Sequence, residues 1–280
     1  MKIAIIGLGL MGGSAAIDLR KRGFASKITG VDSDKINANT ALNIGFVDEI
    51  TDLKTAVKNS ELVILAIPVD AAVSVLPKVL DIVENQVVTD MCSTKSTLLE
   101  RVKYHQNRKR YVASHPMAGT EFSGPWAAIS GMFDGKAAIL CDTEDSDIRA
   151  VAVVKRMYEF LNMRLIYMNG INHNVHAAYV SHISHISSFA LALTVLEKEK
   201  NRKHIFDLAS GGFDSSVRLA KSSPDMWTPI FSQNKENIST VLDTYIENLK
   251  KFKKLIENDE NEQVHSLIKE SNKIKRVLLK

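Results

Sequence analysis

Apolar and polar positions alternate differently in the two halves of this chain. In the first half, short apolar runs typical of buried strands alternate with segments of helical periodicity. The apolar runs lie at residues 2–6, 27–31, 49–50, 62–67, 87–90, 111–113, 136–140 and 164–168. Helical segments follow at 34–43, 53–58, 70–83, 95–104 and 146–161. This order predicts an α/β fold built on a doubly wound, mostly parallel sheet.

From Asn169 onward the pattern is helical only. Helices are predicted over 174–199, 203–209, 215–221, 228–257 and 260–279. We therefore expect two domains, an α/β domain at residues 1–168 and an all-helical domain at residues 169–280. The lysine run from Lys250 to Lys254 is interpreted as a solvated helix face.

The first predicted strand runs directly into a glycine-rich turn. Gly7, Gly9 and Gly12 form the pattern G-x-G-x-x-G, a helical segment follows, and the second strand ends at Asp32, 20 residues after Gly12. These features together are the fingerprint of a Rossmann-type dinucleotide-binding unit. The glycines allow a tight turn and close approach of the backbone to a pyrophosphate, which the helix N-terminus attracts.

The acidic residue at the end of the second strand bears on the choice of nucleotide. The carboxylate of Asp32 can accept hydrogen bonds from ribose hydroxyls and would repel a 2′-phosphate. The sequence therefore favours NAD over NADP, although the neighbouring Ser33 and Lys35 leave NADP open.

Composition narrows the class of protein. The 280 residues are 45% hydrophobic and 24% charged, as in ordinary globular proteins. Two cysteines, Cys92 and Cys141, are too few for a disulfide scaffold and indicate a reducing, cytoplasmic location. No apolar run is expected to be long enough to span a membrane. The net charge of +4 suits an anionic small molecule, and no basic stripe with interleaved aromatic residues indicates nucleic-acid binding.

Three polar clusters follow predicted strands, at residues 67–69, 90–95 and 114–121. Ligands of open α/β sheets bind beyond the carboxyl ends of the strands, so these clusters are candidate site segments. His115 is a candidate general base because the following proline and glycine fix the backbone that carries it. Cys92 is interpreted as a small buried residue, with a reactive thiol as the alternative.

The helical half contributes four histidines within thirteen residues and one conspicuous cation. His173 and His176, and likewise His182 and His185, are three residues apart and share a helix face, which raises a metal site. The stretch offers no Asp, Glu or Cys as a further ligand, so we expect no metal. Arg218 can bind a carboxylate in a bidentate fork, or it can be a surface ion-pair partner.

These residues occur in motifs that resemble the prephenate/arogenate dehydrogenases of tyrosine biosynthesis, over essentially the whole chain. The motifs are the segments 7–14, 90–95, 115–121, 181–185 and 211–227. The family oxidises a cyclohexadienol: NAD⁺ takes a hydride from C4, the 4-hydroxyl loses its proton and the C1 carboxylate leaves as CO₂. The resemblance thus implies oxidative decarboxylation of prephenate to 4-hydroxyphenylpyruvate.

The resemblance also implies roles for individual residues. Neutral His115 would accept the hydroxyl proton, Ser93 would hydrogen-bond in the same site, and Arg218 would bind a substrate carboxylate. The substrate pocket would further contain Ser181, His185 and Gly211. The residues expected to bind NAD are Gly7, Gly9, Leu10, Met11, Gly12, Asp32, Ile67, Pro68 and Ser93.

The chain departs from the family pattern at three positions. Cys92 stands where glycine is usual, Ser184 where proline is usual, and Asn174 where aspartate is usual. The last departure removes a carboxylate and puts in doubt any gating or inhibitor response that depends on that acid.

The resemblance carries expectations about assembly and regulation. The helical domains of the family pair into homodimers, which suits the long apolar helices predicted at 174–199 and 228–257. The chain leaves no room after the helical domain for an ACT-type regulatory domain or a fused chorismate mutase, so we expect a monofunctional enzyme.

Three alternative functions remain open. Arogenate could replace prephenate as the substrate. A β-hydroxyacid dehydrogenase would share the domain plan, but those enzymes commonly use a lysine on the helical domain, whereas this chain has the His115 motif. A redox-sensing NAD(H)-binding module without catalysis would not require His115, Ser93 and Arg218 to occur together.

Overall fold

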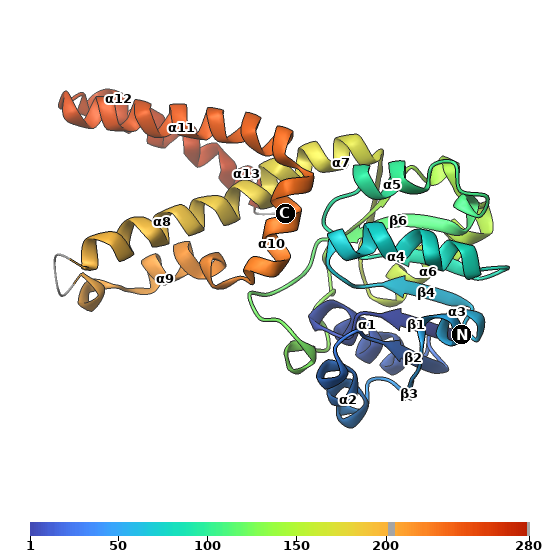
Figure 1. The fold of residues 1–280 in the computed structure, drawn as a ribbon. Coiled ribbons are helices and arrows are strands. Elements are labelled where there is room, and N and C mark those ends of the chain that lie inside the picture. The colour runs from blue at the N-terminus through green and yellow to red at the C-terminus, as the bar shows by residue number, and fades with distance from the viewer. Residues whose placement is uncertain (201–204, 279–280) are drawn as a thin grey trace. The chain divides into compact units, whose positions relative to one another are not determined.

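In the part of the chain that the structure describes, eight strands form one sheet in the order β3-β2-β1-β4-β5-β6-β7-β8 (Figure 1). Their bounds are β1 Lys2–Ile6, β2 Lys27–Val31, β3 Glu49–Ile50, β4 Leu62–Leu65, β5 Val87–Asp90, β6 Tyr111–Pro116, β7 Ala137–Cys141 and β8 Arg164–Met168. Neighbouring strands run parallel except for the antiparallel pair β6 and β7. The predicted doubly wound, mostly parallel sheet is confirmed, with the reversal at β7 as an addition.

The structure is a computed structural model that describes residues 1–200 and 205–278. It divides into two compact units, Met1–Lys235 and Glu236–Lys280. The larger unit contains the sheet and also the first helices that follow Asn169. The division into units therefore falls later in the chain than the change from α/β to helical structure.

Alternate residues of each central strand enter two hydrophobic cores, one on each face of the sheet. Ile3 and Ile5 of β1 pack with apolar residues of the helices on one face, whereas Ala4 and Ile6 pack on the other. The first face is covered by α1 (Leu10–Lys21), α2 (Lys35–Ile44) and α6 (Ile148–Phe160). The second is covered by α3 (Leu53–Lys58), α4 (Val69–Ile82) and α5 (Ser96–Val102). Burial on both faces explains the continuous apolar runs of these strands.

Strand β6 is longer than the sequence predicted and ends at Pro116, so His115 lies within the strand. The loop between β6 and β7, residues 117–136, returns along α1. Its Ile129 N–H donates to Ser14 Oγ at 3.0 Å, and the Ser130 hydroxyl donates to Asp18 Oδ1 at 2.7 Å. This loop, called the return loop below, is thereby attached to the helix that begins at the glycine-rich turn.

The helical part of the larger unit follows β8. Helix α7 (Gly170–Ala177), a π-helical turn (Ala178–His182) and α8 (Ile183–Glu199) form one continuous run. The 3₁₀ turn Phe206–Leu208, α9 (Gly211–Val217), the 3₁₀ turn Arg218–Lys221 and α10 (Pro224–Gln233) complete it. Residues 203 and 204 of the helix expected at 203–209 lie outside the described residues.

The single helix expected at 228–257 is wrong, because the chain breaks at Asn234 between α10 and α11 (Lys235–Glu257). The Asn234 side-chain amide donates to the backbone oxygen of Asn174 at 2.8 Å and contacts His182 Nδ1 at 3.1 Å. These tertiary hydrogen bonds join α10 to the α7–α8 run, and helical periodicity could not predict them.

The run Gly170–Glu199 is long and apolar enough to cross a membrane, by length and composition alone. Its most apolar 18-residue window has a mean hydropathy of 1.3, and 11% of that window is buried. The expectation that no such run exists is therefore wrong, because α7, the π-helical turn and α8 join into one helix. A core helix of a water-soluble protein passes the same test, so length and hydropathy do not identify the surroundings.

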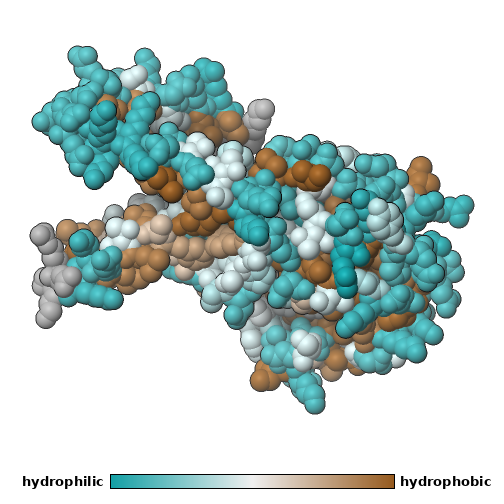
Figure 2. All heavy atoms as spheres, turned by 45° about the horizontal axis from the view of Figure 1, so that its top comes forward, coloured by the Kyte–Doolittle hydropathy of each residue, from teal (hydrophilic) through white to brown (hydrophobic). Residues whose placement is uncertain are grey.

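Apolar side chains are exposed along this run. The hydrophobic ones of α8 contribute to the brown and tan surface in Figure 2. From the π-helical turn through α8, the large ones are Tyr179, Val180, Leu191, Leu193 and Leu196. We call this set the α8 apolar surface.

The described residues of the smaller unit form helices joined by a short turn at residues 258–260. It contains most of α11, followed by α12 (Asn261–Ser271), a 3₁₀ turn (Asn272–Ile274) and α13 (Lys275–Leu278). Residue 279, the end of the helix expected at 260–279, lies outside the described residues. Several large apolar side chains of this unit are exposed, among them Ile246, Leu249, Ile256 and Ile268.

Candidate active site

The glycine-rich turn after β1 has the shape that a dinucleotide requires. Gly7 has φ +96°, and a Cβ there would lie 2.4 Å from the Ala66 carbonyl oxygen. A Cβ at Gly12 would lie 2.0 Å from the Gly7 oxygen, so both glycines are sterically required. At Gly9 a Cβ would meet only Gly124 N, at 3.9 Å, which leaves space beside the first turn of α1. No side chain caps that turn, so its N–H groups are available to a phosphate.

Asp32 lies at the end of β2, beside this turn. Its Oδ2 accepts the Leu8 N–H at 2.9 Å, and its Oδ1 accepts the Asp34 N–H at 2.9 Å. A carboxylate can accept about four hydrogen bonds, so acceptor positions remain for ribose hydroxyls. The residues present therefore fit a dinucleotide.

A cavity of about 680 Å³ lies at the carboxyl edge of the parallel strands and extends to the helical part of the larger unit. Most of the residues that the sequence predicted for the site line this cavity. They are Gly9, Leu10, Met11, Ile67, Pro68, Ser93, His115, Ser181, His185 and Arg218.

Four predicted residues do not line the cavity. Gly7 and Gly12 pack within the turn, and Asp32 lies beside it. Gly211 is exposed at the start of α9, where a Cβ would meet no atom within 4 Å. The structure thus gives no contact between Gly211 and the cavity, and its role stays a prediction.

His115 lines the cavity and is also in contact with the protein interior. Its side chain is buried, and Nδ1 lies 2.8 Å from His173 Nε2. Burial, followed by the proximity of His173 and Lys95, holds the pKa of His115 well below 6.5. His115 is therefore neutral at neutral pH and can accept a proton.

The predicted role of Ser93, a hydrogen bond in the same site as His115, stays a prediction. Ser93 lines the same cavity, in the segment that follows β5. The ring of His115 contacts His173, a residue that the sequence analysis considered only as a metal ligand.

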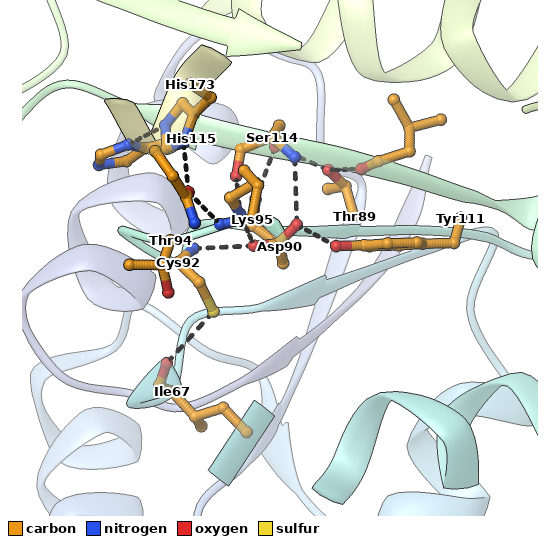
Figure 3. Close-up of polar contacts among 12 residues, drawn as sticks. Ile67, Thr89, Asp90, Cys92, Thr94, Lys95, Tyr111, Ser114, His115 and His173 are labelled. Atoms are coloured by element: carbon orange, nitrogen blue, oxygen red, sulfur yellow. Dashed lines mark hydrogen bonds and ion pairs between the residues drawn. The ribbon is translucent and has the colours of Figure 1, made fainter. Parts of the chain in front are cut away.

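Buried polar side chains form a cluster between the end of β5 and β6 (Figure 3). The Lys95 ammonium pairs with the Asp90 carboxylate, and both side chains are fully buried. Lys95 Nζ also donates to the Ser114 carbonyl at 2.6 Å, and Asp90 Oδ1 accepts the Tyr111 hydroxyl at 2.7 Å and the Ser114 N–H at 3.1 Å. These bonds fasten the end of β5 to β6 and so fix the strand that carries His115.

At the rim of the cavity, Arg218 Nη1 donates to Glu121 Oε2 at 2.9 Å. The Arg218 side chain is 48% exposed and that of Glu121 is 14% exposed. A hydrogen bond from its own backbone N–H, together with the Arg218 guanidinium, lowers the pKa of Glu121. The predicted carboxylate-binding cation is thus paired with a carboxylate of the return loop.

The remaining candidate groups of the helical part have separate surroundings. His185 stacks on Trp227 at 3.5 Å between ring centroids and donates from Nδ1 to the Ser181 carbonyl at 3.1 Å. His176 is exposed. Within the described ranges, no group of three or more His, Cys, Asp or Glu side chains could hold a metal ion. Burial raises the pKa of Cys92 well above its ordinary value, which leaves it an unreactive thiol.

Comparison with known families agrees with this arrangement. Residues 15–167 match the nucleotide-binding domain of prephenate dehydrogenase, and residues 170–270 match its dimerization domain. The chain belongs to the prephenate dehydrogenase family. The two matches meet close to Asn169, where the secondary structure changes from α/β to helical.

Individual relatives of the family are similar along the whole chain. Prephenate dehydrogenase of Bacillus subtilis is 30% identical over 95% of this chain and 73% of the relative. Cyclohexadienyl dehydrogenase of Zymomonas mobilis is 31% identical over 99% and 95%. The crystal structure of Aquifex aeolicus prephenate dehydrogenase with hydroxyphenyl propionate and NAD⁺ superposes with a TM-score of 0.90, at 33% identity over 100% and 98%.

Proposed function

We propose that this protein is an NAD-dependent oxidoreductase that converts prephenate to 4-hydroxyphenylpyruvate, CO₂ and NADH in tyrosine biosynthesis. Membership of the prephenate dehydrogenase family supports the reaction class. The observation that carries the proposal is the position of neutral His115 in the same cavity as the glycine-rich turn and Arg218. A base, a nucleotide site and a cation for a carboxylate are thus available to one substrate.

The dinucleotide would be held by the glycine-rich turn, the first turn of α1 and Asp32. Ile67, Pro68 and Ser93 would border it on the cavity side. When bound, NAD⁺ supplies the hydride acceptor.

His115 would receive the proton of the ring hydroxyl as the carbon that bears it is oxidised. Departure of the carboxylate as CO₂ leaves its electron pair in the ring, which becomes aromatic, and the oxygen recovers a proton from His115. Ser93 would hydrogen-bond near the same hydroxyl. A positioned base of this kind contributes about 10²–10⁴-fold to the rate.

The substrate carboxylate would bind at Arg218. Glu121 occupies that guanidinium in the structure, so an incoming carboxylate would replace it or share the fork. Ser181 and His185 would form the adjoining wall. Gly211 would approach the substrate only through a rearrangement around α9.

We also propose that the chain works as a homodimer, with the domain division near residue 168. The exposed α8 apolar surface and the match of residues 170–270 to a dimerization domain support a second copy as the cover of this surface. Burial of these apolar side chains in a dimer is consistent with a cytoplasmic enzyme. Sedimentation of the purified chain would test this, and a monomer would contradict it.

The test of function is NADH formation by the purified chain with NAD⁺ and either prephenate or arogenate. We expect prephenate to be oxidised faster. A preference for arogenate would reassign the substrate and keep the chemistry, whereas no reaction with either would remove the proposal.

The variant His115→Asn tests whether His115 is the proton acceptor. We expect several hundred-fold lower kcat because the proton acceptor is lost, with NAD⁺ affinity unchanged because the glycine-rich turn is untouched. Near-normal turnover would exclude His115 as the base.

A further inference from the structure

We propose that His173 is a positioning residue that fixes the tautomer of His115, so that the bare nitrogen of His115 is Nε2. This inference rests on the proposed role of His115 as the proton acceptor. It assigns a function to a buried histidine that the sequence offered only as a metal ligand.

The donor and acceptor of each hydrogen bond in this series follow from a group that can only donate. The backbone N–H of Lys95 donates to Asn174 Oδ1 at 2.8 Å. The side-chain atom of Asn174 at this position must therefore be its oxygen, because a nitrogen would place two donors in contact. An amide oxygen only accepts, and it also lies 3.1 Å from His173 Nδ1. His173 therefore carries its proton on Nδ1.

The tautomer of His173 in turn determines the tautomer of His115. A neutral imidazole has a single N–H, so the Nε2 of His173 is an acceptor. That atom lies 2.8 Å from Nδ1 of His115, with the two rings edge-on at 68° (Figure 3). His115 must then donate from Nδ1, and its Nε2 is left without a proton.

Burial keeps both rings in the neutral form that this reasoning requires. His173 is 1% exposed and His115 is 7% exposed. Burial, with Lys95 as the next cause, lowers the pKa of His173 to about 4. The groups that face the pair are the Lys95 ammonium, its partner Asp90 and, from the π-helical turn, His182.

The arrangement suits a base that must charge and discharge in every turnover. When Nε2 of His115 accepts a proton, Nδ1 is already donating to His173, so no ring has to flip. In the wrong tautomer, Nε2 would carry a proton, and His115 could not accept another there. The protein would remain folded but would lack a proton acceptor at Nε2 of His115.

Nitrogen NMR of the ¹⁵N-histidine-labelled protein reads the tautomer directly, without substrate or cofactor. The signal of His115 is assigned by its loss in His115→Asn. We expect a protonated Nδ1 and a bare Nε2 at neutral pH. A protonated Nε2 in the wild-type protein would overturn the inference.

Two variants separate tautomer control from simple packing. In His173→Gln, the side-chain oxygen can accept from His115 and the amide can donate to Asn174, so we expect the same tautomer and kcat within about tenfold. In His173→Leu, the acceptor is gone, so we expect a mixed tautomer and about 10²-fold lower kcat with little change in KM. The matched control is His176→Leu, an exposed histidine on the same helix, which should change neither.

The outcomes distinguish this inference from the proposed function. If His173→Leu retains the tautomer and turnover of His173→Gln, the positioning role is wrong while the function stands. If the wild-type protein oxidises neither prephenate nor arogenate, the proposed function fails, and NMR still decides the tautomer.

Discussion

Polar groups are held differently on two sides of the cavity. One side lies behind His115, and the other is the rim that carries Arg218. Behind His115, Lys95 and Asp90 are fully buried and bond to each other and to the backbone or side chains of β6. At the rim, Arg218 is half exposed and has the carboxylate of Glu121 as its partner. A partly exposed pair can exchange one carboxylate for another, whereas a buried network cannot change without loss of stability.

This difference matches the two tasks of the proposed reaction. The base must keep one geometry and one protonation state before each proton transfer. The cation must release its internal partner when a substrate arrives. Variants on each side of the cavity test whether the two sides differ in this way.

The largest effect is expected at the buried side, in Lys95→Met. Removal of the ammonium leaves the Asp90 carboxylate buried without its counter-charge, so the free energy of unfolding should fall by about 3–5 kcal/mol. Urea denaturation measures this change. Lys103→Met is the control, because Lys103 forms an exposed pair with Glu100 at 3.5 Å and should cost no more than about 0.5 kcal/mol. Equal losses in the two variants would contradict the distinction.

A smaller and different effect is expected at the rim, in Arg218→Ala. The KM for prephenate should rise about 10–100-fold through loss of a carboxylate partner, while stability changes by less than about 1 kcal/mol. Steady-state kinetics measure the KM, and thermal unfolding measures the stability. Arg218→Lys should recover part of the affinity, because it keeps the charge but not the fork. A fall in kcat at unchanged KM would place Arg218 at the reacting atoms instead.

The effect that is smallest at neutral pH is an acid dependence of stability that comes from the buried side. Burial lowers the pKa values of His173 and His182 to about 4, below the ordinary 6.5. The unfolded chain therefore binds more protons in this range, so stability is complete above pH 6.5 and declines toward pH 4. The loss by pH 5 should be about 2 kcal/mol for each histidine.

Denaturation midpoints measured through this window test the acid dependence. His182→Phe should flatten the decline, whereas substitution of the exposed His176 should leave it unchanged. A midpoint that is constant between pH 6.5 and pH 5 would show that these histidines titrate normally.

The sequence predicted the cavity lining better than the network behind it. Gly9, Ser93 and His115 follow or end parallel strands, and strand order alone brings such ends to one edge of a sheet. His173 contacts His115 across 58 residues, and its spacing from His176 resembled a pair of metal ligands. Only the folded chain shows that His173 is buried against His115 whereas His176 is exposed.

The same reason limits what periodicity could say about the fold. The apolar run of β7 does not state its direction, so the antiparallel pairing with β6 was not predicted. The break at Asn234 depends on hydrogen bonds to Asn174 and His182, which lie far away in sequence. Local patterns therefore located the elements, while long-range polar contacts decided their ends and orientation.

The reversed direction of β7 has a consequence for how the nucleotide is enclosed. Because β7 runs back beside β6, the chain between them can pass over the glycine-rich turn, where Gly124 faces Gly9. The return loop is tied to α1 at Ser14 and Asp18. The loop that lies over the glycine-rich turn is thus anchored on the same helix that begins at that turn, so the two sides of the nucleotide half are held by one element.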